Sequence, residues 1–405
     1  MNEIRESYDV VIAGGGPAGA SCAIHLASQG TRVLLIEQKR FPRAKLCGEF
    51  ISPECLEHFE RLGVAERMFD AGGAELIETV FYSERGRKVS VPSAWFGLAK
   101  RSALGLSRAE MDARLLERAR QAGAQVLEET QAHELILEKG RVRGLQLREP
   151  KGAERNVRSL VTIDATGRAS ALVRRIKDEN QASTSLQRKR RARLVAFKAH
   201  LLDTKVQPGR CEIYFYRGGY GGLSYVENGL GNLCFIAHAG DVRACASNPE
   251  RVMREVVCSN ERARQTLLDA RTASPWLSVA LESFGRRKLV PARGLFAIGD
   301  AASFIDPFTG SGMLMALESG EIAASVIKRH LQRLRSGSGF EELSADYSAL
   351  YNERFKARLR VSSLLRRAAF VPGLAGAAIY FFGTSERLRR RLAQATRESR
   401  MQSAE

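Results

Sequence analysis

Three glycines near the start of the chain have the spacing of a site for a nucleotide phosphate. Gly14, Gly16 and Gly19 form a G-x-G-x-x-G pattern. In this pattern the first glycine permits a tight turn, the second lets the backbone approach a pyrophosphate, and the third lets a helix pack closely on a strand. Glu37 follows about twenty residues later, where a carboxylate can accept hydrogen bonds from ribose hydroxyls. We therefore expect this stretch to bind NAD(P) or FAD.

The segments around these glycines are those that must position the nucleotide. Residues 10–13 and 31–36 are apolar runs typical of buried parallel strands. Residues 20–29 can form a helix, which Gly30 would end. The N-terminus of that helix would direct free N–H groups and a positive dipole end at the phosphates. A glycine-rich turn in an unrelated α/β unit is the alternative, and the matching context argues against it.

Length and composition set the broad class of the protein. The chain has 405 residues, of which 44% are hydrophobic, and this length predicts two domains. Its seven cysteines include no C-x-x-C pair and its six histidines show no ligand spacing. We therefore expect no metal site and no disulfide framework. No signal peptide precedes the first strand, which predicts a cytoplasmic location.

The charge balance bears on possible partners. Basic residues outnumber acidic ones, 63 to 45, giving a net charge of +18. The densest basic runs lie at residues 188–193 and 387–391, and neither is interleaved with aromatic residues. Because no nucleic-acid-binding motif is present either, we expect no nucleic-acid partner. Each run is either a solvated face or a contact to an anionic membrane surface.

Further along the chain, a basic loop and two glycine-acid turns carry more candidate residues. The loop at residues 38–50 contains Cys47, and strands are predicted to end in the turns at residues 164–167 and 299–300. A long helix is predicted from about 311 to 334. Between these segments we expect helices after Ser52 and Ser107 and within 249–270. The expected strands lie at 75–91, 124–127, 132–137, 142–147, 194–202, 210–217, 222–227, 231–238 and 282–289.

Three separated signatures together resemble one family, the FAD flavoproteins built on the para-hydroxybenzoate hydroxylase plan, and within it the geranylgeranyl-reductase-like branch. They are residues 14–37, the D-x-x-G motif 164–167 and the G-D motif 299–312. The resemblance covers about residues 8–335 and implies an α/β fold. A Rossmann-like FAD-binding domain would be formed by residues 1–75, 100–175 and 285–340, with an inserted antiparallel-sheet substrate domain (76–99, 176–284) and a C-terminal helical element (341–405).

The resemblance implies FAD as the cofactor and suggests what individual residues do. Asp300 would bind a ribityl hydroxyl, Arg108 the phosphates or ribityl chain, and Arg43 the adenosine side. Asp164 would lie near the pyrophosphate and help to seat the first motif. The helix N-terminus after Gly310 would face the flavin pyrimidine edge. The predicted cofactor-binding set is Gly14, Gly16, Pro17, Ala18, Gly19, Glu37, Gln38, Arg43, Arg108, Asp164, Gly299, Asp300, Gly310, Ser311, Gly312 and Met313.

The reaction implied by the resemblance has three alternatives. The one we expect is an NAD(P)H-using monooxygenase acting on a lipophilic aromatic or polyketide-like molecule of secondary metabolism, which the P-x-x-G-x-G sequence 307–312 favours. Another is reduction of prenyl double bonds, in keeping with the K-x-C-G sequence 45–48. The stretch 220–226 lacks the tryptophan and Phe-Pro of the prenyl reductases, and the Trp-x-Trp-x-Ile-Pro element of the flavin halogenases is absent as well. An electron-relay dehydrogenase is the third.

Residues near the reacting centre are assigned less specifically. Cys47, Pro307 and Gly310 are candidates near the flavin, although Cys47 could equally be a small residue in a glycine turn. Four tyrosines could line the substrate cavity or be ordinary strand residues: Tyr214, Tyr216, Tyr220 and Tyr225. Only one strand–glycine–helix unit is present, so NAD(P)H would visit a groove as a transient reductant.

The C-terminal region combines an apolar run with arginines. Residues 368–385 carry no charge, and basic residues flank the run on both sides. Pro372 and the nearby glycines argue against a clean transmembrane span. We expect a helical element that covers the substrate cavity and makes a peripheral contact with the inner face of the membrane. A soluble cap buried against the catalytic domain is the alternative.

Overall fold

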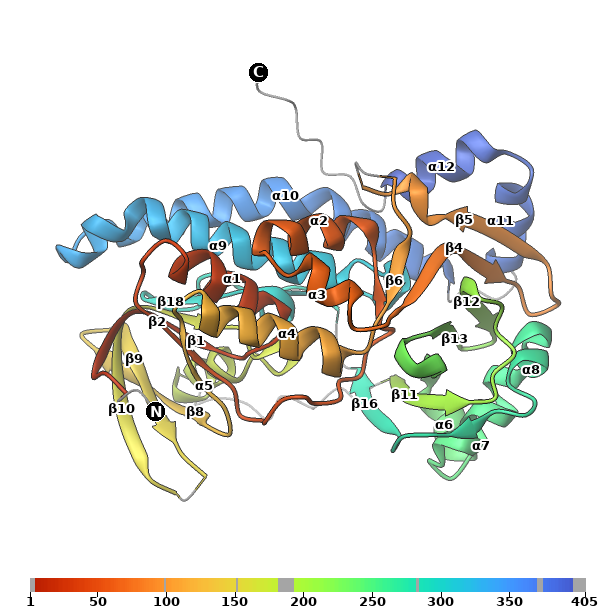
Figure 1. Cartoon of the computed structure of the whole chain (residues 1–405), viewed down its shortest axis with the longest axis horizontal. Coiled ribbons are helices and arrows are strands. Elements are labelled where there is room, and N and C mark those ends of the chain that lie inside the picture. The colour runs from red at the N-terminus through yellow and green to blue at the C-terminus, as the bar shows by residue number, and fades with distance from the viewer. Residues whose placement is uncertain are drawn as a thin grey trace.

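A computed structural model describes residues 4–97, 100–150, 152–180, 193–281, 284–369 and 374–395 (Figure 1). Its first sheet has seven strands: β1 (Ser7–Ala13), β2 (Val33–Ile36), β7 (Gln125–Leu127), β8 (Gln131–Glu138), β9 (Arg141–Arg148), β10 (Glu154–Asp164) and β18 (Leu295–Ala297). The order is β7-β2-β1-β10-β9-β8, and β18 pairs with β10. Pairing is parallel except in the β10–β9–β8 segment. The carboxyl ends of β1, β10 and β18 therefore lie together, where nucleotides bind in such sheets.

Helices cover this sheet and enclose the larger hydrophobic core. They are α1 (Pro17–Ala27), α2 (Pro53–Leu62), α3 (Ala65–Phe69), α4 (Arg108–Gln121), α5 (Ala171–Asn180), α9 (Gly312–Arg335) and α10 (Phe340–Ala369). Helix α1 packs against α9 and α4, and α9 and α10 run side by side along one side of the molecule (Figure 1). Gly320 on α9 leaves room for this packing, because a Cβ there would lie 2.4 Å from the Ala18 carbonyl oxygen.

The second sheet has ten strands: β3 (Phe50–Ile51), β4 (Ala74–Tyr82), β5 (Lys88–Pro92), β6 (Ala103–Gly105), β11 (Leu194–Leu202), β12 (Gly209–Tyr216), β13 (Gly219–Tyr225), β14 (Gly231–His238), β15 (Arg271–Thr272) and β16 (Leu277–Leu281). Pairing is antiparallel except between β12 and β4. Helices α6 (Ala239–Ala244), α7 (Pro249–Glu255) and α8 (Glu261–Thr266) lie beside it (Figure 1). A two-stranded sheet, β17 (Gly285–Arg286) with β19 (Ser303–Phe304), completes the described strands.

The C-terminal helices close the end of the molecule that lies beyond β4 and β5 (Figure 1). They are α11 (Leu374–Gly383) and α12 (Glu386–Ala395), which we call the roof. Both roof helices contact β5, and α12 also contacts residues 93–95. Part of the apolar run 368–385 lies outside the described residues. Among those described, we find no helix whose length and hydropathy would let it cross a membrane.

Several local expectations are corrected. Ser52 precedes α2 but makes no side-chain cap, whereas Ser107 accepts a hydrogen bond from the Glu110 N–H as predicted. Residues 282–283 of the expected strand 282–289 lie outside the described chain, and β17 is all the regular structure that follows within it. No helix was predicted at residues 171–180, where α5 forms and the Asp164 carboxylate accepts hydrogen bonds from N–H groups in its first turn.

Candidate active site

A cavity of about 720 Å³ is lined by residues of both large sheets, of α1 and α9, and of the roof. One part of it is rich in ionisable groups and lies at the carboxyl ends of β1 and β18. We call this part the charged end, and its main members are Gly14, Gly16, Arg43, Arg108 and Asp300. The remainder is bounded mainly by apolar side chains and is described below as the apolar chamber.

The glycine loop at the charged end has the geometry that its spacing predicts. Gly14 has φ +111°, and a Cβ there would lie 2.3 Å from the Ala165 carbonyl oxygen. A Cβ on Gly19 would lie 1.9 Å from the Gly14 carbonyl oxygen. Gly16 precedes α1 and forms no side-chain cap, so N–H groups of the first helical turn face the cavity region. Gly14 and Gly19 are therefore required by close backbone approach.

Two guanidinium groups converge on this loop. A Cβ on Gly16 would lie 3.8 Å from Arg108 Nη2 and 4.0 Å from Arg43 Nη2, so Gly16 leaves an open cradle between two cations and a helix N-terminus. Arg43 Nη1 is buried and forms an ion pair with Asp112 at 3.5 Å, but it has no hydrogen-bond partner among the described residues. This arrangement fits a pyrophosphate, whose oxygens would satisfy the guanidinium and N–H donors.

Carboxylates behind the loop hold these arginines in place. Asp112 accepts hydrogen bonds from Arg108 Nε and Nη2 at 2.8 and 2.7 Å. Burial by itself would lower the pKa of Arg108, but the Asp112 carboxylate outweighs it and the pKa is raised. Glu37 Oε2 accepts a hydrogen bond from the Gly15 N–H at 2.9 Å and forms an ion pair with Arg43 at 3.4 Å. Glu37 lines the cavity, so its carboxylate is placed for a ribose hydroxyl as well.

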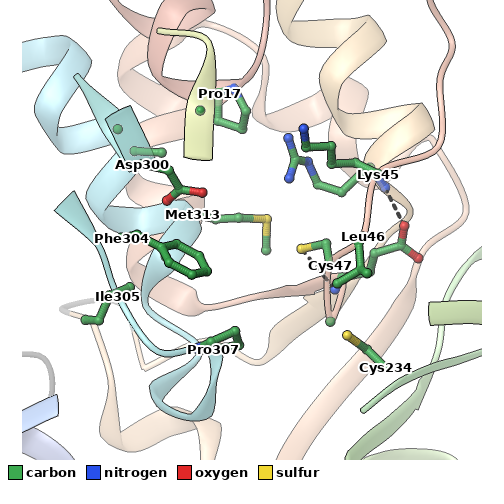
Figure 2. Close-up of a pocket in the computed structure, with 18 of the residues that line it drawn as sticks. Pro17, Lys45, Leu46, Cys47, Cys234, Asp300, Phe304, Ile305, Pro307 and Met313 are labelled. Carbon is green, nitrogen blue, oxygen red and sulfur yellow. Dashed lines mark hydrogen bonds between the residues drawn. The ribbon is translucent and has the colours of Figure 1, made fainter. Parts of the chain in front are cut away.

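Asp300 and Lys45 enter the cavity from opposite walls (Figure 2). Burial raises the pKa of Asp300, and the positive charges of Arg108 and Lys45 oppose that rise. Burial also lowers the pKa of Lys45, with Arg43 and Arg108 acting in the same direction. Asp300 follows β18, next to the N-terminus of α9. The Asp300 carboxylate is thus a hydrogen-bond acceptor beside a helix end that favours negative charge.

The loop that contains Cys47 is fixed by a buried ionic cluster. Glu49, with φ +52°, accepts hydrogen bonds from Lys198 Nζ at 2.9 Å and from the Arg108 N–H at 2.9 Å. His200 Nε2 lies 2.6 Å from the other Glu49 oxygen. Burial alone would raise the pKa of Glu49, but His200 and Lys198 lower it. The cluster ties β11 to the start of α4 and holds Cys47 at the cavity wall.

The apolar chamber is lined by side chains from β4, β5, β12, the 304–308 segment and α11. Phe308 contacts three other aromatic rings, with centroid distances of 6.1 Å to Phe81, 5.6 Å to Phe215 and 5.4 Å to Tyr220. Tyr220 donates a hydrogen bond to Asp306 at 2.5 Å, which joins β13 to the Pro307 turn. Further lining residues are Val89, Val91, Phe96, Ile213, Phe304, Ile379 and Phe382.

The structure brings most of the predicted residues together. The cavity is lined by Gly14, Gly16, Pro17, Ala18, Glu37, Gln38, Arg43, Cys47, Arg108, Gly299, Asp300, Pro307, Gly310, Gly312 and Met313. Figure 2 shows Cys47 facing the wall that carries Asp300, Pro307 and Met313.

Three predicted cofactor-binding residues do not line the cavity. Asp164 is fully buried, and its oxygens accept hydrogen bonds from Thr166, Leu172 and Val173, so it shapes the turn behind Gly14. Gly19 is enclosed against Gly14, and Ser311 is buried at the start of α9. Among the four tyrosines only Tyr220 lines the cavity.

The sequence predicted a C-terminal helical element over the cavity, but not which of its residues line it, and it missed the cluster around Glu49. Ala378, Ile379, Phe382 and Arg389 line the cavity from α11 and α12. An unusual signal was present for α11, because its sequence is apolar on every face. No sequence pattern indicated the role of Glu49, because its partners Lys198 and His200 are 149 and 151 residues away in the chain.

Comparison with known proteins gives three consistent results. The family model described as FAD binding domain matches residues 7–351. Digeranylgeranylglycerophospholipid reductase 2 of Methanopyrus kandleri is 25% identical, over 88% of this chain and 86% of the relative. A geranylgeranyl bacteriochlorophyll reductase-like protein of Thermoplasma acidophilum has TM-score 0.76 and 22% identity over 98% and 97% of the two chains. A flavin-dependent brominase has TM-score 0.77 and 21% identity over 96% and 93%.

Proposed function

We propose that this protein reduces a carbon–carbon double bond in a lipophilic, isoprenoid-type molecule. The premise is that the chain belongs to the FAD binding domain family and is an FAD-dependent oxidoreductase. The observation that carries this proposal is the continuity of the cavity, in which the charged end opens directly into the apolar chamber. A site of this shape can hold a charged dinucleotide next to a chain without polar groups. The digeranylgeranylglycerophospholipid reductase relative supports the same chemistry.

The residues of the charged end would bind and orient FAD. Arg43 and Arg108 would hold its phosphates over Gly16, Glu37 would accept the ribose hydroxyls, and Asp300 would accept a ribityl hydroxyl. When bound and reduced, FAD supplies a hydride, and NAD(P)H would be the reductant that restores it. The Pro307–Met313 segment would position the cofactor's reacting edge at the border with the apolar chamber, where aromatic walls exclude water.

Reduction of a double bond also requires a proton, for which Cys47 is placed. The hydride adds to one carbon and the proton to its neighbour. Cys47 lines the cavity, and its Sγ accepts a hydrogen bond from the Glu49 N–H at 3.4 Å. The Glu49 cluster fixes the loop, so the thiol would be held toward the substrate. We expect Cys47→Ser to slow product formation about a hundredfold, with FAD content unchanged. Cys258→Ser, remote from the cavity, is the matched control.

Hydroxylation remains the second candidate, and one feature of the chamber favours it. Gly222 lines the cavity at the position where the prenyl reductases that the chain resembles carry tryptophan, so this wall has no side chain. The added width would suit a ring system. The Pro307-x-x-Gly-x-Gly segment is the hydroxylase-type turn noted in the sequence. The substrate would then be a lipophilic aromatic molecule, and molecular oxygen the co-substrate.

A single experiment separates the two candidates. The purified holoenzyme is reduced with NADPH or NADH without air and mixed with a geranylgeranyl-bearing glycerophospholipid in deuterated buffer, and the product is analysed by mass spectrometry. The proposal predicts a saturated bond that carries at least one deuterium taken from the solvent. Unchanged lipid, together with an oxygen-dependent gain of one oxygen atom by a lipophilic phenol in air, would replace reduction by hydroxylation.

We also propose that the roof contacts an anionic membrane surface. Tyr380 and Phe381 on α11 are 64% and 59% exposed, although their neighbours Ile379 and Phe382 line the cavity. Arg387, Arg390 and Arg391 are exposed on α12. An apolar helix face next to arginines suits the headgroup region of anionic lipid. A lipophilic substrate could then enter from the inner face of the membrane.

Vesicle flotation tests this contact. The holoenzyme should float with vesicles of phosphatidylglycerol but not with vesicles of phosphatidylcholine alone. The double variant Tyr380→Ser/Phe381→Ser should remain in solution with both. Equal flotation of this variant, or binding that does not depend on lipid charge, would contradict the proposal.

A further inference from the structure

We infer that Arg389 forms a binding subsite for an anionic group, a phosphate or a carboxylate, at the outer end of the apolar chamber. The substrate would then be an anionic amphiphile, with its apolar chain in the chamber and its acidic group at the roof. This inference rests on the proposed function for the position of the lipophilic chain. Arg389 belongs to none of the motifs identified in the sequence.

Arg389 is a cation at an apolar wall. It belongs to α12, lines the cavity, and lies with its guanidinium carbon 5.6 Å from the centre of the Trp95 ring. Its Nη1 donates a long hydrogen bond of 3.4 Å to the Phe382 carbonyl oxygen. Its Nε is buried and has no hydrogen-bond partner among the described residues. Within the described part of the chain, no carboxylate forms an ion pair with Arg389. A desolvated donor of this kind favours an acceptor supplied by a bound ligand.

A smaller pocket that shares Arg389 with the cavity provides room for the acidic group. Its volume is about 190 Å³, and its walls include Lys88 and Arg210. The acid in this pocket, Glu78, already binds Arg210 at 2.6 Å and accepts a hydrogen bond from Ser90. Glu78 therefore offsets Arg210, while Lys88 and Arg389 leave a net positive charge. The pocket adjoins Val89, which also lines the chamber, so an apolar chain and its headgroup could occupy the two spaces together.

Binding of prenyl probes to the holoenzyme tests the subsite without turnover. Farnesyl phosphate, farnesoic acid and farnesol differ in the headgroup alone, and inorganic phosphate supplies the anion without a chain. We expect the wild-type protein to bind farnesyl phosphate or farnesoic acid at least about tenfold more tightly than farnesol. Arg389→Gln should remove this preference and change the affinity for farnesol by less than about twofold. Arg389→Lys should retain part of it.

Arg390→Gln is the matched control, because Arg390 is exposed on the same helix. FAD content and melting temperature confirm that each variant is folded. The inference is overturned if the wild type binds farnesol as tightly as the acidic probes, if Arg389→Gln keeps the preference, or if inorganic phosphate binds as tightly as farnesyl phosphate. Failure of double-bond reduction with intact headgroup preference would reject the proposed reaction and leave the subsite standing.

Discussion

At the charged end of the cavity the side chains are bonded to one another, whereas in the apolar chamber they meet mainly through ring and alkyl contacts. Arg43 and Arg108 are fixed by Glu37 and Asp112 through distances of 2.7 to 3.5 Å. Around Phe308, by contrast, ring centroids are 5.4 to 6.1 Å apart. Directional contacts hold a geometry that suits one class of ligand, and apolar walls tolerate several shapes of similar volume.

This difference explains why the ligand of the charged end can be assigned more narrowly than the ligand of the apolar chamber. A dinucleotide requires donors at fixed places, so the glycines and arginines identify it. A lipophilic chain requires a cavity of sufficient volume that excludes water, and many combinations of apolar side chains supply one. The two ends are nevertheless joined, because α9 starts at the charged end and α10, packed beside it, leads to the roof. The predictions below separate what each end contributes.

The largest effect is expected where the two ends are tied together. Glu318 on α9 is 3% exposed and accepts a 2.7 Å hydrogen bond from Arg358 of α10, which is 1% exposed. Glu318→Gln would remove the carboxylate charge that faces the buried Arg358 guanidinium, so the free energy of unfolding should fall by about 3–5 kcal/mol. Urea unfolding measures this change. Glu341→Gln, at an exposed pair with Arg293, should change it by less than about 0.5 kcal/mol. A Glu318 variant as stable as wild type would show that α10 is anchored elsewhere.

Acid should weaken the same tie. Burial alone would raise the pKa of Glu318, but bonds from His58 and the arginines lower it to about 2. The unfolded state therefore binds the proton more readily, and stability is lost as pH falls from about 5 towards 2, by roughly 3 kcal/mol. Unfolding measured across this range should show the loss in the wild type. The loss should be smaller in Glu318→Gln, and equal slopes would assign the acid sensitivity to other groups.

Next in size is a glycine substitution at the charged end. Gly14→Ala would force a methyl group against the Ala165 carbonyl oxygen at 2.3 Å in a left-handed conformation. We expect FAD to be retained about a hundredfold less tightly, since the phosphate loop must move. Flavin absorbance after dialysis measures this. A Cβ on Gly376 of α11 would meet no atom within 4 Å, so Gly376→Ala should keep its flavin. Equal retention in both variants would contradict the assigned role of the loop.

The smallest effect is expected in the apolar chamber. Phe215→Leu keeps an apolar side chain but loses the ring contact with Phe308. We expect lipophilic probes to bind about fivefold more weakly, with flavin content unchanged. Titration of the holoenzyme with farnesol measures the first quantity and absorbance the second. Loss of flavin in this variant would mean that the two ends are not separable.

The sequence predicted much of the fold and the charged end because those features are local. The strand–glycine–helix unit needs only residues 7–37, and its steric requirements fall on the same few positions wherever it occurs. The turns at 164–167 and 299–300 were recognised for the same reason. Asp164 supports the turn behind Gly14, in keeping with its expected role in seating the first motif, but it does not line the cavity. A carboxylate at a strand end can face a ligand or a following helix, and here it accepts hydrogen bonds from the N–H groups that open α5.

Tertiary structure alone decided the composition of the chamber and the outer subsite. Glu49, Lys198 and His200 meet although β3 and β11 lie far apart in the strand order of the second sheet, and no periodicity in the chain records that contact. Arg389 stands in a run of arginines that are chemically alike, and only the packing of α12 against β5 and residues 93–95 turns it toward the cavity. The local glycine pattern thus determined where a dinucleotide binds. Long-range packing determined the shape of the apolar chamber beside it, because apolar contacts between distant segments leave no pattern in the local sequence.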